Sequence, residues 1–426
     1  MAEQPSPPAS SNLPDESPLT LADCVRVALE SNPRTRSAWL AAQGAAANVG
    51  VRKSANYPVV SVSGSSSVSD MGNLERRENA IGWGLSGRFS VGYLLFDGGA
   101  REGQLEGALA DLRAADFRHQ TVLLDVAFAV QEAWYVLQGA LWYEDAVIDL
   151  LAQAEAQLRL ARARFEVGLG RKYDVAQAEA KLAEVQRLEV VARSQIRQSR
   201  GQLARAMGLD IRTQVPVVKT PAIEVTGDLG NVDLFMDRAL KLRPELGEAK
   251  ARVESALADS IIADSGRYPS ITVDGGVGAG YDTRSNVSIP WSAGIGVTMP
   301  LFDGHEVHYE RRRADYAEKQ AREELRDEVD QVQFEVWAAH VQAGNARAGI
   351  VATHKVLEAA EASVSLAEGN YQQGLGTIVE VFIAQAELAD ARLNLVQARL
   401  DWFLGVARLE RAVGIALEQT RPSEVP

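Results

Sequence analysis

Two short stretches of the sequence carry residue types that bind metals or nucleotides in other proteins. In "HEVHYE" at 305–310, His305 and His308 lie one helical turn apart beside Glu306 and Glu310, a set that could hold a metal ion. The spacing differs from that of the zinc metalloproteases. The stretch leads directly into the charged run "ERRRADYAEKQAREELRDEVD", which is typical of a helix exposed to solvent. We therefore interpret the stretch as the solvated first turn of a helix and predict no metal site.

The second stretch, "GGVGAG" at 275–280, has the glycine spacing of a dinucleotide-binding loop. It lies within a run of alternating residues and opens no helical pattern, which favours glycines of a β-strand. The sequence shows no nucleophile beside a paired base and no phosphate-binding loop after a strand. We therefore expect a protein that is not an enzyme and that needs no cofactor.

The composition is that of a folded, acidic protein. Of the 426 residues, 46% are apolar and 24% are charged, and the net charge is −13. Nucleic acid is excluded as a partner, because phosphate binding needs clustered Lys and Arg. The one cysteine, Cys24, lies in a helical pattern, so the sequence offers neither a disulfide framework nor a Cys/His metal site.

The sequence contains no apolar run of about 20 residues, which excludes a transmembrane helix. Residues 1–18 lack the basic and apolar segments of a signal peptide, and we interpret them as a flexible Pro/Ser-rich arm. If the protein is secreted, we expect its signal peptide to have been removed.

The tetrapeptide Leu-Phe-Asp-Gly occurs twice, with its aspartates at Asp97 and Asp303, 206 positions apart. The same offset relates Gly-Leu-Gly at 168–170 to Gly-Leu-Gly at 374–376. The chain is therefore built from two copies of one sequence repeat. We predict a first repeat over 19–212, a linker over 213–230, a second repeat over 231–417 and a flexible tail over 418–426.

Alternating apolar and small residues precede each tetrapeptide and predict strands with one apolar face. A polar turn divides each stretch, so we predict β-hairpins over 57–96 and 268–302. The last strand is expected to run from Ile289 to Leu301. The apolar face carries the aromatic residues that we expect to face a membrane, namely Trp83, Phe89, Tyr93 and Trp291.

After each tetrapeptide the hydrophobic period becomes 3.5, which indicates long helices in left-handed supercoils. A helix from Gly99 to Gly168 would be roughly 100 Å long at 1.5 Å per residue. Glycines interrupt the pattern at tips near 168–174 and 374–380, after which it resumes. Each repeat is thus predicted as one helix, a β-hairpin and a long helical hairpin.

Four strands cannot close a barrel, and a sheet edge exposed to lipid is not tolerated. Because small barrels begin at about eight strands, neighbouring chains must supply the others. The alternative is a soluble β-layer on a helical bundle. The abundance of glycine on the second face of the strands favours the membrane.

The segments "LTLADCVRVALESNP", "GYLLFDGG", "RFEVGLGRKYDV" and "NYQQGLGTIVEV" follow one another in this order. They resemble the TolC-type outer-membrane efflux protein family, from Leu19 to about Leu417. The resemblance implies an α+β homotrimer in the outer membrane of a Gram-negative bacterium. In such a trimer a twelve-stranded β-barrel in the lipid bilayer continues into a helical coiled-coil barrel across the periplasm.

The resemblance also implies partners and a gate. The partners are a periplasmic adaptor (membrane fusion) protein and an inner-membrane pump of the RND, ABC or MFS type. Asp174 falls at the family's acidic gate position, Tyr371 at its gate tyrosine, and Glu380 at an acidic ring lining the closed entrance. An alternative role for the two acidic residues is helix capping. Thr377 and Glu380 fit a Thr-x-x-Glu capping box, and Asp174 and Gln177 fit its Asp-x-x-Gln analogue at the equivalent turn.

The family's gate arginine corresponds to Gly376 in this chain, so we expect Arg171 or Lys172 to take its place. The two glycine turns are expected to dock the adaptor. They comprise Gly168, Leu169, Gly170, Gly374, Leu375 and Gly376.

These features together predict a passive outer-membrane exit duct that is powered by its partner pump. The alternative is a periplasmic or cell-surface coiled-coil scaffold that transports nothing. A scaffold would be soluble without detergent, whereas a barrel with outward tryptophans would not. Some family members are lipidated at an N-terminal cysteine, but Cys24 lies within the first predicted helix and is no candidate.

Overall fold

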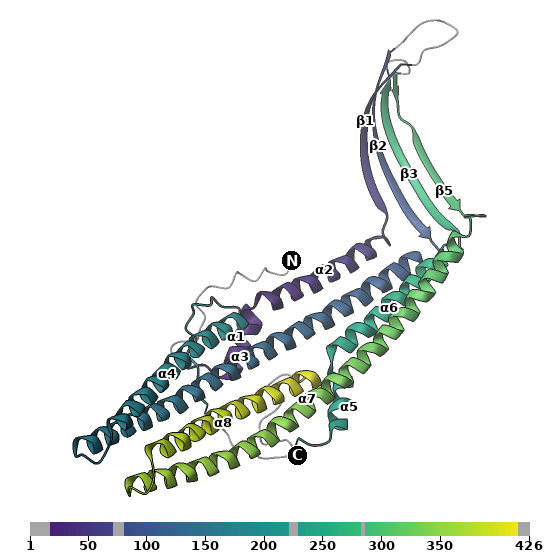
Figure 1. Cartoon of the computed structure of the whole chain (residues 1–426). Coiled ribbons are helices and arrows are strands. Elements are labelled where there is room, and N and C mark those ends of the chain that lie inside the picture. The colour runs from purple at the N-terminus through teal and green to yellow at the C-terminus, as the bar shows by residue number, and fades with distance from the viewer. Residues whose placement is uncertain (1–17, 71–80, 221–228, 283–285, 416–426) are drawn as a thin grey trace. The chain divides into compact units, whose positions relative to one another are not determined.

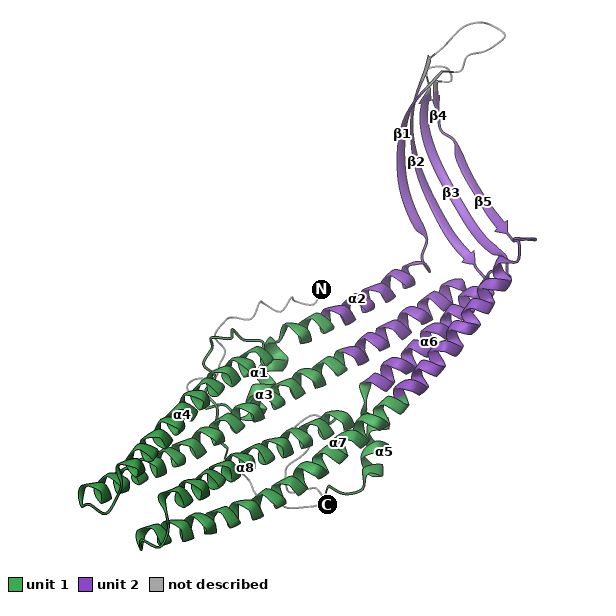
Figure 2. Cartoon of the chain, viewed as in Figure 1, with its two compact units in different colours: residues 1–39, 119–244, 329–426 green, residues 40–118, 245–328 purple. Residues whose placement is uncertain are grey.

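The computed structural model describes residues 18–70, 81–220, 229–282 and 286–415. The predicted tail lies outside the described residues, as do nearly all of the predicted arm and part of the predicted linker. The chain divides into two compact units (Figure 2). Unit 1 comprises Met1–Trp39, His119–Pro244 and Val329–Pro426, and unit 2 comprises Leu40–Arg118 and Glu245–Glu328. Each unit contains segments of both repeats, so the compact units do not follow the boundary between the repeats.

The sheet belongs to unit 2 and is antiparallel (Figure 1). Strand β2 pairs with β1 on one side and with β3 on the other, and β3 pairs in turn with β4 and β5. Because β2 comes from the first repeat and β3 from the second, the two predicted hairpins merge into one sheet. The strands are β1 (Val59–Asp70), β2 (Ile81–Phe96), β3 (Ser270–Asp282), β4 (Asn286–Ser288) and β5 (Trp291–Thr298).

The register gives this sheet one apolar and one polar face. Val62 lies opposite Phe89, Phe89 opposite Val277, and Val277 opposite Trp291. Directly opposed residues project from the same face, so all the long strands place apolar side chains together. The other face is built from Ser63, Gly84, Arg88, Ser90, Asp274, Gly276, Gly278, Ser292 and Gly294.

The last strand is shorter than the alternation from Ile289 to Leu301 predicts. Strand β4 ends at Ser288, β5 begins at Trp291, and β5 ends at Thr298. Pro290 lies in the gap, where its missing N–H cannot donate to the ladder. Its carbonyl oxygen still accepts a hydrogen bond from the backbone N–H of Gly278, at 2.8 Å.

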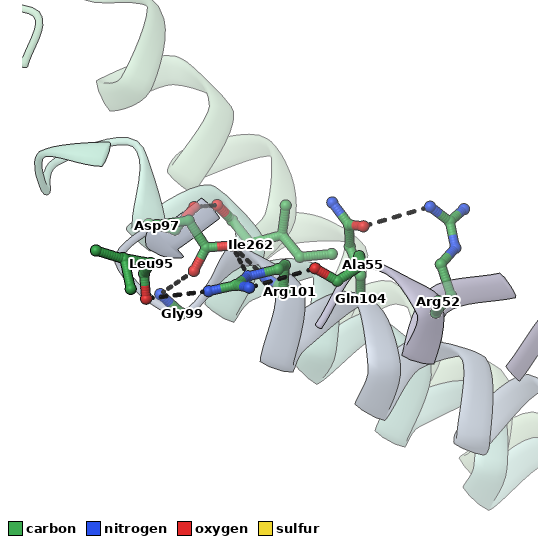
Figure 3. A network of polar contacts seen from close by, with 9 residues as sticks. Arg52, Ala55, Leu95, Asp97, Gly99, Arg101, Gln104 and Ile262 are labelled. Atoms are coloured by element: carbon green, nitrogen blue, oxygen red, sulfur yellow. Dashed lines mark hydrogen bonds and ion pairs between the residues drawn. The ribbon is translucent and has the colours of Figure 1, made fainter. Parts of the chain in front are cut away.

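The first Leu-Phe-Asp-Gly turn connects β2 to α3 (Ala100–Glu166). The carboxylate of Asp97 accepts hydrogen bonds from the backbone N–H and the Nε of Arg101, each at 3.0 Å (Figure 3). The guanidinium of Arg101 also donates to the carbonyl oxygens of Ala55 and Leu95, each at 3.3 Å. Gly98 has φ +67°, and a Cβ there would lie 2.7 Å from the Cβ of Tyr268. Arg101 therefore links the end of β2, the start of α3 and the residue that follows the preceding helix.

The second copy of the tetrapeptide caps α7 (Glu306–Gln372) in the same way. The carboxylate of Asp303 accepts hydrogen bonds from the backbone N–H groups of His305, at 2.9 Å, and Val307, at 3.0 Å. The hydrogen bond from Val307 is the main cause that lowers the pKa of Asp303. The tetrapeptide is thus repeated because each strand must turn sharply into a capped helix.

Unit 1 is helical and holds the main hydrophobic core. It contains α1 (Leu21–Ser31), α4 (Lys172–Ala206), α5 (Val232–Leu242), α8 (Ile378–Val413) and the later parts of α3 and α7. The segment at 215–218 runs beside Leu19, whose N–H donates to the Pro216 carbonyl oxygen at 2.7 Å. The core around it includes Cys24, Val27, Val130, Trp134, Leu137, Leu203, Met207 and Val215.

Each repeat begins with two helices rather than the single helix predicted. Helix α2 (Pro33–Ser54) follows α1 after Asn32, and α6 (Pro244–Ser265) follows α5 after Arg243. Asn32 has φ −70° and ψ 127°, and Arg243 has φ −67° and ψ 117°. A residue that precedes proline is disfavoured in the helical region, so the helix breaks at both places.

The long helices have the length that the heptads predict. Helices α3 and α7 contain 67 residues each, which corresponds to about 100 Å at 1.5 Å per residue. Within unit 1, α4 returns along α3 and α8 returns along α7 (Figure 1). Small buried side chains at Ala154, Ala161, Ala178, Ala384 and Ala391 let the helices approach closely.

Candidate functional site

The two glycine turns close the helical hairpins of unit 1 with the same backbone geometry. Gly168 has φ +78° and Gly374 has φ +76°. The N–H of Leu169 donates to the Arg164 carbonyl oxygen, and the N–H of Leu375 donates to that of Asn370, both at 2.8 Å. Glycine is the residue that adopts a positive φ at a helix C-terminus with the least strain. Leu169 is 74% exposed and Leu375 is 77% exposed, so each tip presents an apolar side chain.

The third residue of each turn is a glycine for steric reasons. A Cβ at Gly170 would lie 2.9 Å from the backbone nitrogen of Phe165. At Gly376 it would lie 3.0 Å from the Glu380 carboxylate and 3.1 Å from the Asn370 Cβ. A larger residue at position 376 would therefore displace the Glu380 side chain.

Asp174 and Glu380 both lie at the third position of a helix and bond back to its start. The Arg171 N–H donates to the Asp174 carboxylate at 3.1 Å. The Thr377 N–H donates to the Glu380 carboxylate at 3.3 Å, and the Glu380 N–H donates to the Thr377 hydroxyl oxygen at 3.4 Å. Both carboxylates thus take part in helix capping, and Thr377 and Glu380 form a complete capping box. The predicted box of Asp174 and Gln177 is wrong, because Arg171 is the N-cap residue of α4 and the Gln177 amide donates to the Tyr173 hydroxyl instead.

Tyr371 lies at the end of α7 and is only 6% exposed. It packs in an apolar cluster that joins the two helical hairpins, together with Leu158, Ala161, Ala178, Ile378 and Val381. Burial raises the pKa of its hydroxyl, the nearby Arg164 opposes this shift, and Asp174 adds to it. Tyr371 and Asp174 therefore lie near each other in unit 1.

The basic residue that contacts Tyr371 is neither of the two predicted from the sequence. The side chains of Arg171 and Lys172 are both exposed. Instead, the guanidinium carbon of Arg164 lies 4.6 Å from the centroid of the Tyr371 ring. In the sequence, Arg164 is a basic residue in the last turn of a predicted helix, where it would stabilise its own helix end. Nothing in that position signals a contact with another helix.

The sheet of unit 2 holds the four aromatic residues expected to face a membrane. Trp83, Phe89 and Trp291 are exposed, by 59%, 45% and 79%, and Tyr93 is half-buried. On the polar face, the guanidinium of Arg88 donates to the Ser292 hydroxyl at 3.0 Å. The Arg88 side chain crosses β3 at Gly276 and Gly278, which leave room for it. The sequence analysis did not predict a functional role for Arg88.

The stretches "GGVGAG" at 275–280 and "HEVHYE" at 305–310 lie in a strand and at the start of a helix. "GGVGAG" lies inside β3, as its alternation predicts. His305 lies in the Asp-Gly turn with φ +71°, and His308 lies in the first turn of α7. Among the residues that the structure describes, no three His, Cys, Asp or Glu side chains come together in a way that could hold a metal ion. Every helix in the described parts of the chain is too short or too polar to cross a membrane.

Comparison of the chain with known proteins identifies relatives along most of its length. Outer membrane protein TolC of Vibrio cholerae serotype O1 is 25% identical over 322 residues, which cover 74% of this chain and 73% of that protein. Protein CyaE of Bordetella pertussis is 27% identical over 402 residues, which cover 91% of this chain and 82% of that protein.

Solved structures of low sequence identity share the fold. The outer membrane protein VceC of Vibrio cholerae has a TM-score of 0.79 and 20% identity, over 93% of this chain and 97% of that one. The CmeC outer membrane channel of Campylobacter jejuni has a TM-score of 0.81 and 17% identity, over 94% of this chain and 87% of that one. The family model described as outer membrane efflux protein matches residues 24–209 and 235–415. This chain therefore belongs to the outer membrane efflux protein family.

Proposed function

We propose that this chain forms a passive exit duct across the periplasm and outer membrane, through which a partner pump exports its cargo. Membership of the outer membrane efflux protein family supports this role. Relatives that are named for efflux or secretion include the outer membrane efflux protein BepC of Brucella suis and the alkaline protease secretion protein AprF of Pseudomonas aeruginosa. The cargo of the duct is set by its partner pump.

The observation that carries the proposal is the two-faced sheet. Its apolar face exposes Trp83, Leu85, Val287, Trp291 and Ile295, each by 59% or more. An apolar surface of this extent is expected to contact lipid. The opposite face, with its serines, glycines, Arg88 and Asp274, has the small and polar character of a water-filled lumen.

The edges of the sheet support assembly from several copies. Within the described residues, β1 pairs only with β2, and β5 pairs only with β3. Unpaired backbone groups in lipid would cost several kcal/mol each, so a second copy must pair with these edges. Strands β4 and β5 pair with successive parts of the same edge of β3, so each copy supplies four strand positions. Three copies would close a twelve-stranded barrel, which is the trimer that the family resemblance implies.

The tips of unit 1 are the proposed gate and docking surface. Three copies of Asp174 and Glu380 around an axis would repel one another and attract cations, which suits an entrance that is poised to open. Arg171 and Lys172 lie at the first tip, and Tyr371 ends α7 just before the second tip. The exposed Leu169 and Leu375 are suited to bind an apolar pocket of the adaptor.

Reconstitution in a planar lipid bilayer tests the proposal. Detergent-purified protein is expected to insert and to conduct ions in discrete steps, and Arg88→Glu is expected to shift the selectivity towards cations because Arg88 faces the lumen. Arg113→Glu is the matched control, since Arg113 pairs with Glu254 on the helices instead. A protein that stays in solution without detergent and produces no conductance would be the coiled-coil scaffold.

A further inference from the structure

The side chain of Arg164 joins the two helical hairpins of unit 1 near their tips. Arg164 belongs to the last turn of α3, in the first hairpin. Its Nη1 donates to the carbonyl oxygen of Tyr371 at 3.2 Å and approaches that of Gln372 at 3.5 Å. These two residues end α7, in the second hairpin. One side chain therefore caps the end of a helix in the other hairpin.

The position suits a guanidinium for two reasons. The last four carbonyl groups of a helix have no partner within the helix, and the C-terminus carries a partial negative charge. In addition, the Arg164 guanidinium lies over the ring of Tyr371, 4.6 Å from its centroid. A cation over an aromatic face is attracted more strongly when both groups are shielded from water, and Tyr371 is buried.

The tyrosine hydroxyl does not share in this contact. Among the residues that the structure describes, the buried Tyr371 hydroxyl has no hydrogen-bond partner. The ring and the backbone carbonyl of Tyr371 make the link to the first hairpin. Phenylalanine at this position would therefore keep both elements of the link.

We propose that Arg164 is the clasp that holds the two hairpin tips of one protomer together, and that its release lets the tips separate. The clasp rests on the proposed function only for its effect on the pore, because the contact itself lies within a single chain. Arg164 is a positioning residue: it places Tyr371 and the end of α7 against the first hairpin. It fills the role for which the sequence nominated Arg171 or Lys172.

Arg162 provides the matched control. It lies two residues earlier on the same helix and pairs with Glu179 of α4 at 2.7 Å, so its ion pair stays inside the first hairpin. Replacing either arginine by methionine removes one charge and keeps a long side chain. Only the Arg164 variant removes a contact between the hairpins.

The experiment measures tip separation and pore size in the same variants. Spin labels are attached to Leu169→Cys and Leu375→Cys, one on each tip, in a chain whose own cysteine is removed by Cys24→Ala. The distance between the labels is measured by pulsed electron paramagnetic resonance. Arg164→Met is expected to lengthen and broaden the distance distribution and to raise the bilayer conductance. Loss of a cation–π contact of ordinary strength shifts the closed-to-open ratio by about tenfold per protomer. Arg162→Met is expected to match the wild type in both measurements. Tyr371→Phe keeps the ring and the backbone carbonyl that Arg164 contacts, so it is expected to open the tips less than Arg164→Met does.

The proposal fails if Arg164→Met keeps the wild-type distances and conductance. It also fails if Tyr371→Phe opens the tips as far as Arg164→Met does, because the hydroxyl would then be the lock. Should Arg164→Met not assemble, Arg164→Lys keeps the charge and is expected to separate the tips partially; wild-type distances in that variant count against the clasp. A wild type that never conducts overturns the duct, whereas the label distances still decide the clasp.

Discussion

The backbone of Gly208 lies against Asn32, so closely that a Cβ at Gly208 would sit 2.7 Å from the Asn32 Cα. Gly208 has φ +75°, and the Asn32 side-chain amide donates to the Ala206 carbonyl oxygen at 2.8 Å. The second repeat has the same arrangement at Gly414, where the Arg243 guanidinium donates to the Ala412 carbonyl oxygen at 3.2 Å. In each repeat the residue between the first two helices thus caps the last helix.

We predict that Gly208→Ala destabilises the protein markedly. The substitution adds a clash with Asn32 to the strain of positive φ, which alone costs about 1–2 kcal/mol per residue. Gly168→Ala is the matched control, because Gly168 has φ +78° and a Cβ added there would meet no other atom within 4 Å. Thermal unfolding in detergent should show a larger fall in the midpoint for Gly208→Ala. Equal falls would mean that the close packing at Asn32 contributes nothing.

Capping and gating by Glu380 can be separated with two substitutions. Thr377→Ala removes the N-cap hydroxyl, and we expect a loss of about 1 kcal/mol in stability with unchanged block by multivalent cations. Glu380→Gln keeps a side chain that can complete the capping box but removes the charge. We expect it to leave stability unchanged and to weaken the cation block measured in bilayers. A wild-type block in Glu380→Gln would assign Glu380 to capping alone.

Cys24 is predicted to be unreactive in the folded protein. The side chain is fully buried, and burial raises the pKa of its thiol to about 12 from an ordinary 9.0. Because the thiolate is the reactive form, its population at pH 8 falls on the order of a thousandfold. Iodoacetamide should label Cys24 only after denaturation, as mass spectrometry would show. Rapid labelling of the native protein would contradict the core of unit 1.

The exposed tip leucines are predicted to bind the adaptor. Leu169→Asp combined with Leu375→Asp should abolish co-purification of the adaptor, because each carboxylate would have to be buried in an apolar pocket. Val190→Asp is the matched control, since Val190 is 66% exposed on α4 and lies away from the tip. Adaptor binding that survives the double substitution would place the docking surface elsewhere.

Patterns with a strict period were predictable from the sequence. The alternation before Asp97 and Asp303 identified the strands and their apolar face, and the heptads identified helices of the observed length. Both follow from periodic placement of apolar residues, which is a local property of the sequence. The capping box at Thr377 and Glu380 was equally visible, because its two residues are three positions apart.

Features that depend on contacts between distant segments were not predictable. Arg164 contacts Tyr371 across 207 positions of the sequence, and nothing in either local pattern connects them. The hydrogen bond from Arg243 to the Ala412 carbonyl oxygen likewise joins segments that are 169 positions apart. Pro290 itself indicates a break in a strand. The alternation of apolar residues continues on both sides of it, so the sequence pattern predicted a strand that includes Pro290.

The duct is tested most directly by electron microscopy of detergent-purified particles. A threefold-symmetric particle with a helical stem about 100 Å long is expected, because α3 and α7 have that length at 1.5 Å per residue. A β-barrel closed by strands from all copies should be visible in the end view. A monomeric particle, or an assembly without an axial lumen, would contradict the duct and with it the gate at the tips.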